Sequence, residues 1–224
     1  MPSPRKIHSP QLGKFMNTLT QNDLDNALAK VPQVTLAFWI VKILATTLGE
    51  TGGDAVSMSM NLGYLAATGI FATLFLVFVA AQIRAKQYHP ALYWATIIAS
   101  TTVGTTMADF FDRSLGIGYS GGSTILLALL LGSLWVWKKS TGSVAVDTVA
   151  SPRTELFYWT TIMFSQTLGT ALGDWTADTA GLGYSGGAVV FSVLLAGVAL
   201  AYFKTQISRA ALFLAAFILT RPLG

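Results

Sequence analysis

Six of the ten acidic residues lie in or beside long apolar stretches of the chain. These residues are Glu50, Asp54, Asp109, Asp112, Asp174 and Asp178. An ionised carboxylate in hydrocarbon is costly unless it faces a cavity, a partner or the membrane surface. In membrane proteins, such acids commonly mark pathways for ions or protons. These six residues are therefore the first candidates for chemistry in this sequence.

The spacing of these acids adds hydroxyl groups to the same helical face. On a helix, Thr47, Glu50 and Asp54 fall at positions i, i+3 and i+7, and so share a face. The spacing recurs in two further sets, Thr102, Thr105 and Asp109, and Thr167, Thr170 and Asp174. Any metal bound within the membrane would have to use oxygen ligands, which favour Mg, Ca or Mn over Zn or Cu. The pattern predicts a cation site with Asp54, Asp109 and Asp174 as metal ligands. Further candidates are Glu50, Asp112, Asp178, Thr47, Thr102 and Thr167.

A structural interpretation of the aspartates stays open. Each lies near the end of its apolar stretch, where a carboxylate can cap the following turn through backbone amides. Such a cap needs no ligand. Glu50 and Asp178 favour a functional site, because a repeated cap would not need different extra acids in different places.

Other kinds of site lack the residues that they need. The chain has no cysteine, and its two histidines, His8 and His89, lie outside the apolar stretches. Thiolate metal sites and iron–sulfur clusters are therefore excluded. Nothing resembles a phosphate-binding loop, a Ser–His–Asp set or a His-rich motif. We expect no enzymatic activity and no cofactor.

The elements that carry these residues are expected to be membrane-spanning helices. Apolar residues form 53% of the chain, charged residues 11%, and the mean hydropathy is +0.57. Soluble domains carry about 25% charged residues. Six apolar blocks reach the ~20 residues that a bilayer crossing needs. A seventh stops at the end of the chain. The expected fold is all-α, a polytopic transmembrane bundle of seven spans.

The apolar blocks belong to an internal repeat. When Trp39, Trp94 and Trp159 are aligned without gaps, five further positions become identical in all three copies. They are Thr47/Thr102/Thr167, Gly49/Gly104/Gly169, Asp54/Asp109/Asp174, Gly63/Gly118/Gly183 and Tyr64/Tyr119/Tyr184. Each copy is predicted to be a hairpin of two helices.

The motif W…TxG…D…GY resembles a bacterial membrane family of four tandem two-span repeats with a characteristic tryptophan and no known function. The resemblance covers the chain from about Val34 onward. It implies four repeats and a location in the bacterial inner membrane. It implies no activity.

The repeats divide the chain into segments. We expect a cytoplasmic leader (1–33), repeat 1 (34–87), repeat 2 (88–140), a linker (141–154), repeat 3 (155–207) and the start of repeat 4 (208–224). Gly224 holds the position of Gly169 in the repeat, so we expect the natural protein to continue to eight spans.

The basic residues predict the orientation. Eleven of the fourteen lie in the leader and the loops between repeats, whereas the turns inside the hairpins hold only Arg113. By the positive-inside rule, the N-terminus and these loops are cytoplasmic. All repeats then enter the membrane from one side as parallel copies. The net charge of +4 reflects basic loops beside an anionic leaflet, without nucleic acid.

Two functional hypotheses follow. The first is an inner-membrane transporter or carrier of a cation, either Mn, Mg or a proton-coupled ion. The second is a non-transporting scaffold or interaction protein whose aspartates are structural caps. The expected partners are the lipid bilayer and a divalent cation or proton, and an oligomer is allowed. We also expect the repeat tryptophans to anchor at the membrane surface, and Lys42 to reach that surface or pair with an acid.

Overall fold

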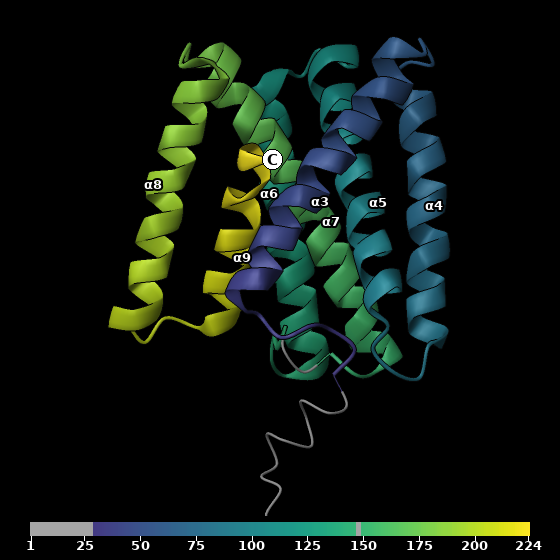
Figure 1. Ribbon diagram of the computed structural model, residues 1–224, viewed down its shortest axis with the longest axis vertical. Coiled ribbons are helices and arrows are strands. Elements are labelled where there is room, and N and C mark those ends of the chain that lie inside the picture. Colours follow the sequence, from purple (N-terminus) through teal and green to yellow (C-terminus); the bar gives the residue numbers. More distant parts are fainter. Residues whose placement is uncertain (1–28, 147–148) are drawn as a thin grey trace, which may run out of the picture.

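The computed structural model describes residues 29–146 and 149–224, and most of the expected leader lies outside this part. The described residues form seven α-helices, which run alternately up and down (Figure 1). They are α3 (Leu36–Asp54), α4 (Tyr64–Arg84), α5 (Pro90–Asp109), α6 (Gly118–Thr141), α7 (Pro152–Asp174), α8 (Gly183–Lys204) and α9 (Arg209–Leu219). The predicted all-α class is confirmed.

The three helical hairpins, α3–α4, α5–α6 and α7–α8, share one local design. In each, the first helix ends at the repeat aspartate and continues as a five-residue π-helical turn. These turns are Ala55–Ser59, Phe110–Ser114 and Trp175–Thr179. A glycine with positive φ then reverses the chain, for example Gly63 at 78°. Only glycine adopts this conformation without a steric penalty. Single π-helical turns are rare and often lie at functional sites.

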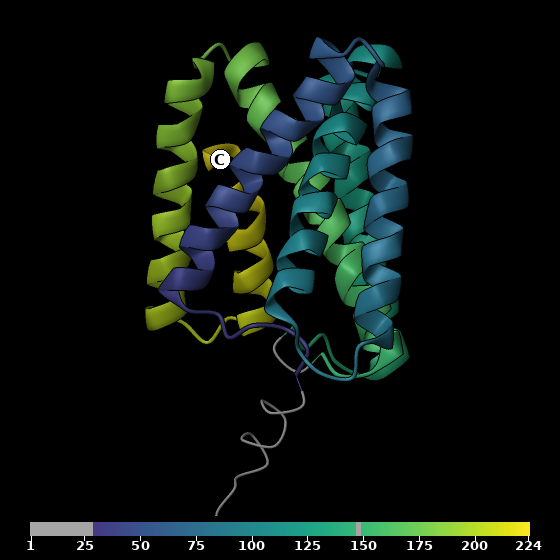
Figure 2. The same cartoon turned by 45° about the vertical axis from the view of Figure 1, so that its right-hand side comes forward.

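The first helices of the repeats form an inner ring. Helix α3 packs against α5, α5 against α7, and α7 against α9. The 3₁₀ turn after α9, η4 (Arg221–Leu223), returns to α3 and closes the ring. Helices α4, α6 and α8 lie outside this ring, and Figure 2 shows α4 and α8 at opposite sides of the bundle. Each outer helix packs on the inner helix of the next repeat, α4 on α5, α6 on α7 and α8 on α9.

Close contacts at one repeat position hold the ring together. The position is a glycine, and a Cβ on it would collide with or press on the neighbouring inner helix. The four contacts are Gly49 on Thr101, Gly104 on Gln166 and Thr167, Gly169 on Arg221, and Gly224 on Thr46. Each glycine thus meets the same repeat position of the next copy. Small residues at such positions let helix backbones approach closely in membranes.

Aromatic side chains close the end of the ring opposite the π-helical turns. The ring centroids of Phe38 and Trp94 lie 5.5 Å apart, and those of Tyr93 and Trp159 lie 5.4 Å apart. The hydroxyl groups of Tyr93 and Tyr158 are hydrogen-bonded at 2.7 Å. Trp159 is only 2% exposed, so the expectation that it anchors at the membrane surface is wrong. Its indole packs inside the bundle.

Within the part of the chain that the structure describes, three helices are long and apolar enough to cross a membrane by length and composition, and all three are outer helices. They are α4, α6 and α8. The sequence predicted seven spans, and the difference has a physical cause. The inner helices carry the threonines, glycines and acids of the repeat, and these residues lower the mean hydropathy of the inner helices. Much of this polar surface is buried between neighbouring inner helices. Helix α9 has 11 residues.

Candidate functional site

The structure gathers the three repeat aspartates at one end of the inner ring. Asp54, Asp109 and Asp174 each hold the last position of their α-helix, directly before the π-helical turn. Asp109 is 4% exposed, and the other two are half-buried. Asp109 is close enough to both Asp54 and Asp174 for the carboxylates to repel one another. These three residues form an acid cluster.

A single arginine on a π-helical turn faces the acid cluster. The Nε of Arg113 forms an ion pair with Oδ1 of Asp109 at 2.9 Å. The same guanidinium also attracts Asp54 and Asp174 electrostatically. One cation is thus shared by three carboxylates, and the cluster keeps an excess of negative charge when all are ionised.

A second ion pair lies one helical turn deeper in the ring. Arg221, on η4, pairs with the carboxylate of Glu50 on α3 and donates a hydrogen bond to the hydroxyl of Thr105 on α5. Thr105 in turn donates to Oε2 of Glu50 at 3.2 Å. The Nε of Arg221 is buried and has no hydrogen-bond partner in the described part of the chain. This network joins three inner segments across the ring.

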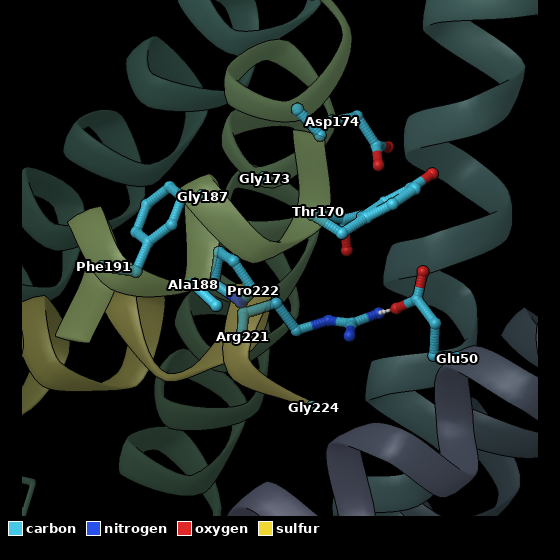
Figure 3. A pocket seen from close by; sticks show the side chains of 12 residues that line it. Glu50, Thr170, Gly173, Asp174, Gly187, Ala188, Phe191, Arg221, Pro222 and Gly224 are labelled. Atoms are coloured by element: carbon cyan, nitrogen blue, oxygen red, sulfur yellow. Dashed lines mark ion pairs between the residues drawn. The ribbon is translucent and has the colours of Figure 1, made fainter. Parts of the chain in front are cut away.

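A cavity of about 120 Å³ adjoins this ion pair and Asp174, while Asp54 and Asp109 are not part of its lining. Its polar lining includes Glu50, Thr170, Asp174, Tyr184 and Arg221. Figure 3 shows Arg221 extending from its turn toward Glu50, with Asp174 above the pair on α7. A space of this size accommodates a few water molecules or a partly hydrated small ion.

The two further acidic candidates, Asp112 and Asp178, lie outside the cavity lining, as do Asp54 and Asp109. Asp112 is buried against Gly122 of α6, and its two oxygens have no hydrogen-bond partner among the described residues. Asp178 is exposed and accepts a hydrogen bond from the hydroxyl of Tyr119 at 2.8 Å. The structure therefore separates Asp112 and Asp178 from the cavity that Glu50 and Asp174 line.

The three threonine candidates are not brought together. The hydroxyls of Thr47, Thr102 and Thr167 donate to carbonyls one turn earlier in their own helices, those of Ile43, Ile98 and Met163. None of the three lines the cavity. They lie at the glycine contacts of the ring, where they contribute to packing. Thr105 and Thr170, one turn further along, are the threonines that reach the site.

The three repeat aspartates neither cap the π-helical turns nor form a complete set of metal ligands. At the start of the three π-helical turns, no aspartate side chain makes a capping hydrogen bond. Within residues 29–146 and 149–224, no three His, Cys, Asp or Glu side chains are grouped so that they could hold a metal ion. The arrangement is a polar cavity with carboxylates and guanidinium groups, in which protein ligands alone do not enclose an ion.

Three segments of the chain match the family model described as Repeat of Unknown Function (DUF347), at residues 37–88, 92–143 and 157–208. The chain belongs to the DUF347 repeat family. Each matched segment covers most of one inner helix and the whole outer helix that follows it. No curated protein and no solved structure matches the chain. The predicted repeat is confirmed for three DUF347 copies, and the family description assigns no activity.

The functional residue that sequence analysis missed is Arg221. It lies beyond the three matched DUF347 segments, but it falls at the repeat position of Thr46, Thr101 and Gln166. A polar residue at this position in every copy was the available signal. Gln166 uses the position similarly, since its Nε2 donates to the hydroxyl of Thr101 at 2.6 Å.

The expectation for Lys42 is also wrong. Its amine is buried, and among the described residues it pairs with no acid. The Nζ of Lys42 donates to the carbonyl of Phe217 at 3.0 Å and to the hydroxyl of Thr220 at 2.8 Å. Both acceptors lie at the end of α9, where the helix dipole favours a cation. Lys42 therefore ties α9 to α3.

Proposed function

We propose that this protein is a membrane transporter of a cation, and that the cation is held between the acid cluster and Glu50. The supporting observation is an excess of carboxylates at one end of the inner ring, where two of them, Glu50 and Asp174, line a cavity. Four acids, Glu50, Asp54, Asp109 and Asp174, face two arginines, Arg113 and Arg221. Acids placed within a membrane bundle at this density are characteristic of ion pathways.

The proposal includes how the bundle sits in the membrane. The outer helices α4, α6 and α8 contact lipid, and the inner helices cross the same bilayer within the ring that the outer ones shield. The basic loops at the aromatic end face the cytoplasm of a bacterial cell, and the π-helical turns face outward. The acid cluster then lies near the outer surface, and the aromatic side chains close the inner end.

The cation that suits this site is small and keeps part of its hydration shell. Mg and Mn are bound in proteins by one or two carboxylates and several waters. The cavity is lined by two carboxylates, those of Glu50 and Asp174, and no three acidic side chains of the described residues are grouped as metal ligands. A partly hydrated ion suits such a site. A proton is the smaller alternative, and its transport or co-transport uses the same carboxylates.

The test is transport by purified protein in lipid vesicles. Uptake of labelled Mn²⁺, with unlabelled Mg²⁺ as competitor and a pH-sensitive dye inside the vesicles, covers the proposed ions. Replacing Asp54, Asp109 or Asp174 by Asn should lower flux at least tenfold, because hard cations require anionic oxygen. Asp178→Asn is the matched control and should keep normal flux, since Asp178 is exposed and belongs neither to the acid cluster nor to the cavity lining. Full activity in all three Asn variants at the cluster would contradict the proposed site.

A non-transporting scaffold is the second candidate. The ion pairs of Asp109 with Arg113 and Glu50 with Arg221 also stabilise helix packing, as a structural cluster would. In that case the wild-type protein moves none of the three ions, and the Asn variants alter only its melting temperature.

A further inference from the structure

Arg221 reaches across the inner ring. Its own segment, η4, packs against α7 and α3, which are the neighbours of α9 in the ring. Its guanidinium nevertheless donates to Thr105 on α5, the inner helix opposite α9. The side chain therefore crosses the axis of the ring. It is 2% exposed, so this crossing lies inside the bundle.

The two charges of the Arg221–Glu50 pair occupy ring positions that are neutral in the other copies. The equivalents of Arg221 are Thr46, Thr101 and Gln166, and those of Glu50 are Thr105 and Thr170. The ring thus contains one added base and one added acid, and these two contact each other. Both also line the cavity. A cation that enters the cavity therefore meets the Glu50 carboxylate, which is already paired with the Arg221 guanidinium.

The cost of leaving a partly buried carboxylate without a counter-ion explains what this arrangement can do. The Arg221 side chain is 1% exposed and the Glu50 side chain 33%, so the guanidinium is buried and the carboxylate is partly so. Removing one partner of an ion pair inside a protein leaves an uncompensated charge, which is unfavourable. A carrier must also return its empty site across the membrane, and Glu50 without a counter-ion would oppose that step. A guanidinium held on the protein neutralises Glu50 in the empty state. A bound cation repels the guanidinium and replaces it.

We propose that Arg221 is a tethered cation that occupies Glu50 and crosses the ring axis while the site is empty, and that the transported cation displaces it. This inference rests on the proposed function. It predicts a difference between two modes of transport. Net uptake requires the empty site to return, whereas exchange of external for internal cation does not.

The experiment compares both modes in lipid vesicles with labelled Mn²⁺. Net uptake is measured into vesicles without Mn²⁺, and exchange into vesicles loaded with unlabelled Mn²⁺. In Arg221→Gln, net uptake should fall at least tenfold while exchange stays within about threefold of wild type, because only the return of the empty site needs the tethered charge. Arg221→Lys should retain part of the net uptake, because it keeps the charge. Arg84→Gln, which removes an exposed arginine outside the ring, is the control.

A double variant keeps the test decisive if Arg221→Gln does not fold. Glu50→Gln with Arg221→Gln removes both charges, so no carboxylate at this position needs compensation. Because Glu50 also belongs to the proposed site, both fluxes should fall in this variant, but net uptake should fall no more than exchange. Equal loss of net uptake and exchange in folded Arg221→Gln would overturn the inference and leave the proposed function intact. Loss of net uptake with exchange retained in the double variant would also overturn it. Absence of Mn²⁺ flux in wild type would overturn the inference together with Mn²⁺ transport itself.

Discussion

At the scale of single residues, Lys42 shows how the bundle holds a buried cation without an acid. Its acceptors are a backbone carbonyl and a hydroxyl at the end of α9, and its Nζ lies 4.6 Å from the centroid of the Phe217 ring. Backbone dipoles and a ring face provide the negative potential that a carboxylate would otherwise supply. Lys42 is therefore separate from the acid cluster, and its role is packing.

Replacing Lys42 by Met should leave the melting temperature unchanged or raise it. Well-packed apolar residues in place of buried charges are often neutral or stabilising by about 1–4 kcal/mol. The equivalent positions hold Ile97 and Ile162, and the hydroxyl of Thr220 keeps its hydrogen bond to the carbonyl of Ala216. Lys42→Ala is the matched control and should destabilise by about 2–5 kcal/mol through the cavity it leaves. A marked fall in the melting temperature of Lys42→Met would show that the charge itself stabilises the ring.

At the scale of helices, the repeat glycines decide how closely the inner helices approach. Gly49 and Gly52 lie on the same helix, three residues apart. A Cβ at Gly49 would overlap the side chain of Thr101 on α5, whereas a Cβ at Gly52 would meet nothing within 4 Å. The two positions separate the effect of packing from that of helix propensity.

Gly49→Ala should therefore destabilise the protein by about 1–3 kcal/mol, the usual cost of overpacking a tight contact. Gly52→Ala should be neutral or stabilising by up to about 1 kcal/mol, because alanine is the better helix former. Thermal unfolding of both variants in detergent measures the difference. Similar stabilities for the two would contradict the close contact between α3 and α5.

The hairpins could be predicted from the sequence, because the residues that build them are local. Each copy carries its own aspartate, turn glycine and tyrosine, for example Asp109, Gly118 and Tyr119. The order of the ring could not be predicted, because it depends on contacts between copies. Apolar periodicity also does not distinguish lipid from a neighbouring helix, and for this reason the burial of Trp159 was missed.

Of the candidate site, only the acidic residues could be predicted from the sequence. Asp54, Asp109 and Asp174 share a repeat position, and parallel copies place that position at one end of the bundle. Their counter-ions could not be inferred. Arg113 belongs to one copy only, and the polar residues at the repeat position of Arg221 do not indicate that this arginine pairs with Glu50.

At the scale of the whole molecule, the outer layer is uneven. Helices α5, α7 and α9 each have an outer helix packed along them, and in the described residues α3 has no equivalent partner. The effect is visible at equivalent positions. Leu44 and Leu48 of α3 are 64% and 58% exposed, whereas Ala99 and Val103 of α5 are 5% and 1% exposed. The apolar side chains of α3 add to the lipid-facing surface of the outer helices.

The direction in which the acid cluster faces is set by the orientation of the whole bundle. The basic loops and the π-helical turns lie at opposite ends of the helices (Figure 1). Because eleven of the fourteen basic residues precede the first span or lie between repeats, we expect the turns to face the outside of the cell. These 224 residues contain no cysteine, so a single introduced cysteine is a unique target for labelling in this chain. In spheroplasts, a membrane-impermeant maleimide should label Ser114→Cys, on the second π-helical turn. Thr205→Cys, in the loop after α8, should react only in inverted vesicles. The reverse pattern would place the acid cluster at the cytoplasmic surface and would require the proposed path of the cation to be inverted.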